Sequence, residues 1–199
     1  MEAISKTRTA FLNAARKLFA REGFDKTTMN DIAVESQRGR RTLYTYFKNK
    51  NEVFTAVIEQ ELESLSVELA SIVESPLKAT KKLLMYGQRR LALISEVVKR
   101  NGSLNAAFFQ DISLVERARL RFDIQETRSI QKILREGIAA SEFEVTDTRF
   151  MAILLHNSLK GLEVPYIKGQ LSRKIIGAVD INKVIKQFIF EGIAKRNND

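Results

Sequence analysis

Hydrophobic residues recur at intervals of three and four along nearly the whole chain. Between residues 5 and 22 they form one stripe, which Gly23 ends: Phe11, Ala14, Ala15, Leu18 and Phe19. This spacing places them on one face of an α-helix. Alternation of the kind that predicts a strand never extends beyond a few residues. The pattern therefore predicts an all-α protein.

Two short helices follow the first stripe. Thr28 and Asp31 have the spacing of a capping box, which predicts a helix from about residue 29 to Gln37. A second helix is expected from about Gly39 to Phe47. Its Leu43 and Phe47 share one face, and Arg41 and Thr45 lie roughly opposite. This pair predicts a helix-turn-helix motif.

Longer helices are predicted after the motif. Asn49 and Glu52 mark the start of a helix that continues to about Glu74, and Pro76 is expected in the first position of the next. The helix after Pro76 is predicted to end near Arg100, and a short helix to span 103–112. A long helix then ends at about Ser141. Another follows a cap at Asp147 and ends at about Lys168, and the last runs from about Asp180 to Lys195. Leu120, Ile124, Ile130, Ile133 and Leu134 are assigned to the inner face of the helix that ends near Ser141.

Charge supports an anionic partner for the predicted motif. The formal net charge is +9, and five Lys or Arg residues with no acidic residue lie between Ser36 and Lys50. Alone, this cluster fits a solvated basic face as well as a DNA-binding one. Arg and Thr at base edges and Tyr and Lys at phosphates would be a typical division of contacts.

Two runs at fixed spacing resemble the TetR family of transcriptional regulators. One extends from Phe11 through Gly23-Phe24 and Thr27-Thr28 to Ile32-Ala33, and the other comprises Thr42-Leu43-Tyr44, Tyr46-Phe47, Lys50 and Phe54. The resemblance implies an N-terminal three-helix DNA-binding domain over residues 1–50. A helical ligand-binding and dimerisation domain is implied over residues 51–199.

The resemblance also assigns DNA contacts to the motif. It implies contact by Thr28, Arg40, Arg41, Thr42, Tyr44, Tyr46 and Lys50, with Thr45 at a variable contact position. Arg38 joins Arg40 and Arg41 near the start of the second helix, where guanidinium groups suit phosphate or guanine. Within this set we expect Arg40, Arg41 and Thr45 to read bases and Lys50 to bind phosphate.

The turn of the motif departs from the family pattern. Gln37 stands where the family usually has a glycine in the left-handed conformation, and Gly39 follows two residues later. Either Gln37 is strained, or the glycine function has moved to Gly39.

For the remaining helices the resemblance implies two further sites. A small-molecule cavity would be lined by Asn105, Phe108, Phe109, Gln110 and Phe122. For the three aromatic residues, plain core is the alternative. A homodimer interface would use Leu154, Leu155, Ser158, Leu162, Ile185, Phe188, Ile189 and Gly192. Burial of these apolar stripes in the protein's own core is the alternative.

The sequence offers few residues for metal binding or catalysis. The chain has no cysteine and one histidine, His156, on a strongly apolar helix where a packed side chain is the favoured interpretation. We expect no metal, no cofactor and no catalytic group, because no nucleophile–base pair or ligand-spaced cluster is apparent. Without an apolar leader or spanning segment, a cytoplasmic protein with no membrane partner is expected.

These observations predict a homodimeric repressor that leaves a palindromic double-stranded DNA operator when a small molecule binds. An activator, or a regulator without a ligand, stays open within the same class. A helical enzyme or a protein-binding adaptor is the alternative from a different class.

Overall fold

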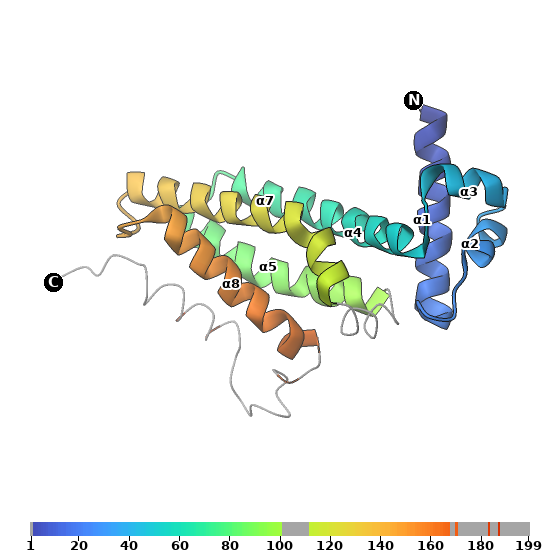
Figure 1. Ribbon diagram of the computed structural model, residues 1–199. Coiled ribbons are helices and arrows are strands. Elements are labelled where there is room, and N and C mark those ends of the chain that lie inside the picture. The colour runs from blue at the N-terminus through green and yellow to red at the C-terminus, as the bar shows by residue number, and fades with distance from the viewer. Residues whose placement is uncertain (1, 101–111, 168–169, 171–182, 184–186, 188–199) are drawn as a thin grey trace. The chain divides into compact units, whose positions relative to one another are not determined.

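The computed structural model describes residues 2–100 and 112–167, with single positions at 170, 183 and 187. Seven helices carry the regular structure of these residues (Figure 1): α1 (Glu2–Glu22), α2 (Met29–Glu35), α3 (Arg40–Tyr46), α4 (Lys50–Val73), α5 (Ala79–Arg100), α7 (Ile112–Ala139) and α8 (Thr148–Ile167). The all-α prediction is confirmed. The predicted short helix over 103–112 and the predicted last helix lie almost wholly outside the described residues.

The chain divides into two compact units. Residues 1–63 and 96–120 form unit 1, and residues 64–95 and 121–199 form unit 2. Helices α4, α5 and α7 each contribute residues to both units. A domain boundary at residue 50 stays a prediction; it coincides with the start of α4 at Lys50.

An aromatic cluster forms the centre of unit 1. The rings of Phe19 and Phe54 lie 5.8 Å apart between centroids, and Phe24 lies 4.9 Å from Phe54. Phe11, Phe19 and Phe54 are almost completely buried. These residues come from α1, α4 and the segment between α1 and α2, so their packing joins the first helix to the fourth.

Unit 2 depends on contacts between residues far apart in the sequence. The carboxylate of Glu142 accepts hydrogen bonds from the backbone N–H groups of Ala79 (3.3 Å) and Thr80 (2.9 Å) and caps the start of α5. The buried Lys82 donates to Glu136 at 2.7 Å and to the carbonyl of Val73 at 2.7 Å. These contacts fix the ends of α4, α5 and α7 relative to one another.

Two predictions about these helices are wrong. Pro76 lies three residues before α5 rather than in its first position, because the capping carboxylate of Glu142 sets the start at Ala79. Leu120 and Ile124 are 61% and 44% exposed rather than buried. The buried side of α7 includes the charged residues Arg119 and Glu126. The positions of the apolar residues alone therefore do not identify the inner face of this helix.

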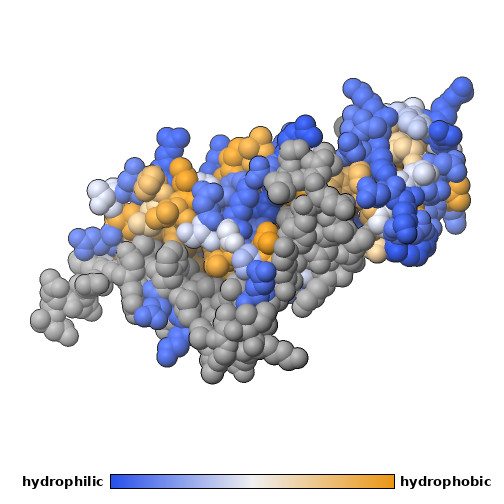
Figure 2. Space-filling model, turned by 60° about the horizontal axis from the view of Figure 1, so that its bottom comes forward, coloured by the Kyte–Doolittle hydropathy of each residue, from blue (hydrophilic) through white to orange (hydrophobic). Residues whose placement is uncertain are grey.

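Hydrophobic side chains also remain at the surface. On the face seen in Figure 2, hydrophilic surface is interrupted by separate hydrophobic patches. Large exposed hydrophobic residues include Val34, Val67, Leu120, Phe150 and Leu154. No helix among the described residues has the length and apolar content needed to cross a membrane.

Gly137 provides a test of the close packing in unit 2. A Cβ atom at this position would lie 2.1 Å from the ring of the buried Phe143. We expect Gly137→Ala to lower the free energy of unfolding by about 1–3 kcal/mol through overpacking, as measured by urea denaturation. Phe143→Ala should remove most of that penalty in the double variant. An equal loss in both backgrounds would show that the ring is not the cause.

Candidate DNA-binding site

The start of α2 is fixed by the predicted capping box. The N–H of Asp31 donates to Thr28 Oγ1 at 3.2 Å, and the N–H of Thr28 donates to Asp31 Oδ2 at 2.8 Å. Both groups would otherwise lack a partner at the helix N-terminus. The capping prediction is confirmed, although the helix ends at Glu35, two residues before the predicted end.

The turn between α2 and α3 contains a strained residue. Gln37 has φ of 55°, in the left-handed region, whereas Gly39 has φ of −64° and precedes α3 in extended conformation. The N–H of Arg38 donates to the carbonyl of Ala33 at 3.1 Å and closes the turn. The interpretation that Gln37 is strained is therefore confirmed, and the shift of the glycine function to Gly39 is wrong.

Helix α3 has a buried underside and an exposed basic face. Leu43 is 0% exposed and Phe47, which follows the helix, is 3% exposed. Among the predicted contact residues near α3, Tyr46 is half-buried. The others lie at the surface: Arg38, Arg40, Arg41, Thr42, Tyr44 and Thr45. The structure thus brings the predicted base-reading residues together on accessible surface of one short helix.

Local contacts orient several of these side chains. The guanidinium carbon of Arg40 lies 5.7 Å from the ring centroid of Tyr44, a cation–π distance. Tyr46 packs against Phe11 with centroids 5.8 Å apart, and Thr45 Oγ1 donates to the carbonyl of Thr42 at 2.6 Å. An amphipathic Tyr46 anchored in this way can direct its hydroxyl outward.

Lys50 has a different environment from the other predicted contacts. Its amino group donates to the backbone carbonyls of Phe24 at 2.7 Å and Asp25 at 3.2 Å. It also lies 4.3 Å from the centroid of the Phe24 ring. Sequence reasoning did not reveal these contacts, because the partners are 25 and 26 residues away.

One of the five predicted ligand-binding residues lies in the described part of the chain. Phe122 is buried and lines a cavity of about 220 Å³ in unit 2, together with Tyr86 and Glu126. Ser66, Gln125 and Ser129 add polar groups to its wall. Asn105, Phe108, Phe109 and Gln110 lie outside the described residues.

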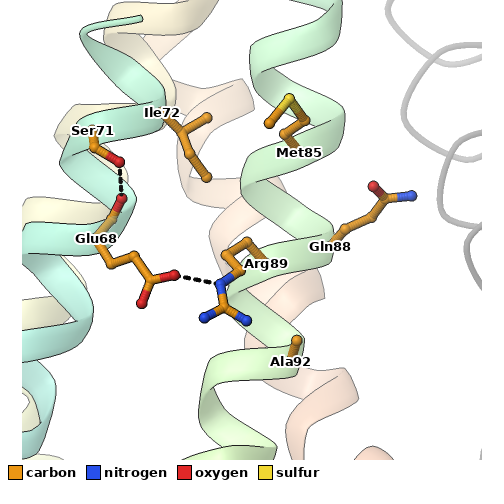
Figure 3. Close-up of a pocket in the computed structure, with 7 residues that line it drawn as sticks. All are labelled: Glu68, Ser71, Ile72, Met85, Gln88, Arg89 and Ala92. Carbon is orange, nitrogen blue, oxygen red and sulfur yellow. Dashed lines mark hydrogen bonds and ion pairs between the residues drawn. The ribbon is translucent and has the colours of Figure 1, made fainter.

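A second hollow in unit 2 is an open groove between α4 and α5. Figure 3 shows the side chains that line it, among them Glu68 and Arg89, which form an ion pair across the groove. Its volume is about 580 Å³, and Met85 and Ile72 supply apolar surface. The charged groups of Glu68 and Arg89 that line the groove are already paired with each other, so they are less available to a ligand.

The predicted dimer residues on α8 do not share one face. Leu154 is 47% exposed, whereas Leu155 is 4% exposed and belongs to the core of unit 2. Ser158 and Leu162 are half-buried, and Ile185, Phe188, Ile189 and Gly192 lie outside the described residues. The exposed face of α8 consists instead of Phe150, Ile153, Leu154, Asn157 and Gly161, which follow helical spacing.

Unit 2 also contains a buried ionic cluster that sequence reasoning missed. Arg90 is 0% exposed and donates to both oxygens of Glu126, at 2.5 and 2.8 Å, and to Glu163 at 2.6 Å. His156 is also buried, with Nδ1 3.3 Å from Glu126 Oε2 and Nε2 3.9 Å from Asp123 Oδ1. The favoured interpretation of a packed histidine is confirmed.

Charge pairing explains how this cluster is tolerated. Burial opposes the charged form of Glu126, but the Arg90 guanidinium and His156 outweigh it and lower the pKa of Glu126. Asp123, Glu126 and His156 are close enough to offer ligand atoms to one cation. However, both oxygens of Glu126 already bind Arg90, and Asp123 accepts a hydrogen bond from Lys160 at 2.9 Å. The cluster therefore has the character of an ion-pair network joining α5, α7 and α8.

A short helix with a packed underside and a basic outer face, preceded by a capped helix and a tight turn, defines a helix-turn-helix DNA-binding protein. Comparisons with known proteins agree. The sequence model described as "Bacterial regulatory proteins, tetR family" matches residues 11–57. The "Probable acrEF/envCD operon repressor" of Escherichia coli is 27% identical over 169 residues, covering 79% of this chain and 74% of that protein.

Solved structures extend the likeness to the whole fold. A transcriptional regulator from Cytophaga hutchinsonii has a TM-score of 0.70 and 27% identity, covering 93% of this chain and 97% of that one. SmeT in complex with triclosan also has a TM-score of 0.70, at 17% identity, covering 96% and 93% of the two chains. Residues 11–57 thus match the TetR family, and the chain over most of its length is similar to transcriptional regulators. These similarities support a DNA-binding transcriptional regulator.

The strained turn predicts a stabilising substitution. Gln37→Gly should raise the free energy of unfolding by about 1 kcal/mol, because glycine adopts positive φ without a Cβ clash. Ser36→Gly is the matched control: Ser36 has φ of −78°, so glycine there should be destabilising. Chemical denaturation of both variants measures the difference. A Gln37→Gly variant no more stable than the wild type would contradict the assignment of strain.

The capping box predicts a dependence of α2 on pH. Hydrogen bonds from the Thr28 side chain and backbone lower the pKa of Asp31 from its ordinary value of 3.8. A lowered folded pKa means that the contribution is present above pH 3.8 and is lost as pH falls through the folded value. Hydrogen exchange of the first-turn amides of α2 should therefore accelerate in this acid range. Asp31→Asn should lack that step; the same step in Asp31→Asn would assign it to another group.

Proposed function

We propose that this regulator is a homodimeric, cytoplasmic repressor that binds a palindromic operator and leaves it when a small molecule binds. The observation that carries the proposal is the exposed basic face of α3 above its buried Leu43 and Phe47. A helix anchored from beneath presents its outer side chains in fixed directions, which specific reading of base edges requires.

The division of labour on α3 follows from side-chain chemistry. Arg40 and Arg41 carry forked donors that match the two acceptors of guanine in the major groove. Thr45 adds a short side chain with a methyl group and a hydroxyl, which suits closer approach to bases. Thr28, Tyr44 and Tyr46 lie at helix ends or flanks and are assigned to phosphates, where hydroxyl groups contribute orientation without sequence preference.

Dimer formation is assigned to the exposed face of α8. One seven-residue helix offers too little surface for tight and specific binding. Two copies on a two-fold axis would read half-sites about 34–36 Å apart. Phe150, Ile153 and Leu154 supply apolar area for such an interface, and Gly161 allows close approach of a second helix.

The cavity beside Tyr86 and Phe122 is our candidate for the effector site. Its volume of about 220 Å³ is below the usual range of roughly 300–1,000 Å³ and suits a small ligand. SmeT, which has this fold, is seen with triclosan, and the Escherichia coli relative is named as an operon repressor. Binding that favours one spacing of the two DNA-binding helices would release the operator by shifting the population of states.

The proposal predicts a position-specific loss of affinity for Arg41→Ala. After the operator is identified by selection from random duplexes, the variant should lose about 1–3 kcal/mol at one base pair and relax preference there. Lys48→Ala is the control for charge alone and should weaken all sequences alike. Electrophoretic mobility shifts on single-base operator variants measure both. An equal loss on every sequence for Arg41→Ala would remove Arg41 from the base-reading group.

The interface proposal predicts that Leu154→Glu gives monomers. A buried unpaired carboxylate costs far more than the lost apolar contact, so association should fail while α3 is untouched. Leu120→Glu is the matched control, since Leu120 is also an exposed leucine, on α7. Sedimentation velocity and operator binding should change only for Leu154→Glu. A dimer that persists in this variant would exclude the α8 face.

A further inference from the structure

We propose that Gln37, in the turn between α2 and α3, is a further DNA contact whose side-chain amide donates to a backbone phosphate of the operator. The inference rests on the proposed DNA-binding function and adds one residue to the contacts assigned there. Gln37 is exposed, and Arg38, Arg40 and Arg41 follow it within four residues.

The backbone at Gln37 is fixed by the way in which α2 ends. The N–H of Gln37 donates to the carbonyl of Val34 at 3.0 Å, and the N–H of Arg38 donates to that of Ala33 at 3.1 Å. These bonds form a Schellman motif, in which the residue after the C-cap adopts the left-handed conformation and is usually glycine. Gln37 has φ of 55° at this position, so its Cβ atom introduces strain that glycine would not have.

The side chain of Gln37 makes no polar contact within the described part of the chain. Strained residues of this kind cluster at binding sites, where contacts with a ligand are part of their role. A primary amide has two N–H donors, and phosphate oxygens commonly accept hydrogen bonds from glutamine in protein–DNA complexes. The strain, the exposure and the unused donors together indicate an intermolecular role.

A second turn in the protein shows that strain alone does not assign this role. Ser141 has φ of 57° after the end of α7, and its N–H donates to the carbonyl of Ile138 at 3.0 Å. The residues that follow Ser141 include Glu142 and Glu144 and no Lys or Arg before position 149. The same backbone motif therefore lies in acidic surroundings at Ser141 and in basic surroundings at Gln37.

The position of Gln37 favours a phosphate over a base edge. Gln37 lies three residues before the start of α3 and so outside the helix whose side chains are assigned to bases. Three residues span at most about 11 Å, which keeps the amide close to that helix. Because the amide is neutral, its bond to a phosphate would help to orient α3 without releasing a counterion.

Two substitutions separate the amide from the strain. Gln37→Met keeps the side-chain length and the strained backbone but removes the donors, whereas Gln37→Gly removes both donors and strain. We expect each variant to bind the selected operator about tenfold more weakly in mobility shifts, although Gln37→Gly is the more stable protein. Ser141→Gly relieves the same kind of strain in unit 2 and should leave operator affinity unchanged. Wild-type affinity in Gln37→Met would overturn the proposal.

Phosphate ethylation of the operator tests the contact directly. One ethylated phosphate should weaken binding of the wild-type protein and have no further effect on Gln37→Met. The loss in Gln37→Met should be equal on all single-base operator variants, with an unchanged slope of log K against log salt. Identical ethylation patterns for the two proteins, or a loss confined to one base pair, would overturn the phosphate contact.

Failure of the proposed function would look different from failure of this inference. If selection from random duplexes yielded no sequence that the wild-type protein binds, the DNA-binding function would fail, and this contact with it. If the wild-type protein binds its operator and Gln37→Met binds equally well, only the role of Gln37 fails.

Discussion

The proposed reading of DNA by α3 depends on the burial of two side chains beneath a helix that would not be stable in isolation. Helix α3 has seven residues, well below the length of roughly 12–15 residues at which isolated helices become even marginal in water. It forms because Leu43 and Phe47 are inserted into unit 1. The positions of Arg40 and Arg41 are therefore set by apolar packing on the opposite side of the helix.

In unit 2, buried ion pairs constrain how the helices pack against one another. Arg90 forms a bidentate pair with Glu126 and a further bond to Glu163, so one guanidinium joins α5, α7 and α8. Removing such groups from water costs several kcal/mol per ion, and the pairing offsets most of that cost. An arrangement of this kind adds little net stability, but it heavily penalises any other register of the three helices.

Local signals in the sequence were sufficient for much of unit 1. The Thr28–Asp31 cap, the burial of Leu43 and the inner stripe of α1 each depend on residues within a few positions of one another, and local spacing identifies them. Contacts over long sequence distances were not predictable in this way. Glu142 at the start of α5, Lys50 on the turn before α2, and Arg90 with Glu163 are polar pairs that periodicity assigns to solvent.

The same limit explains why the burial of residues on α7 and α8 differs from the expected pattern. On α7 the inner face was identified by its aliphatic residues, yet Arg119 and Glu126 are buried and Leu120 is exposed. On α8 Leu155 was grouped with Leu154, although neighbouring helix positions differ by about 100° in direction. Hydropathy alone fails wherever a charged residue is paired inside the protein or an apolar residue is kept at the surface.

The contrast between the aromatic centre of unit 1 and the ionic centre of unit 2 has a thermal consequence. Apolar cohesion weakens on cooling, so the packing of Phe19, Phe24 and Phe54 is most vulnerable toward low temperature. The penalty for dehydrating charges falls on heating, so the pairing of Arg90 with Glu126 becomes less costly as temperature rises. The aromatic packing of unit 1 and the ion pairs of unit 2 thus respond to temperature in opposite directions.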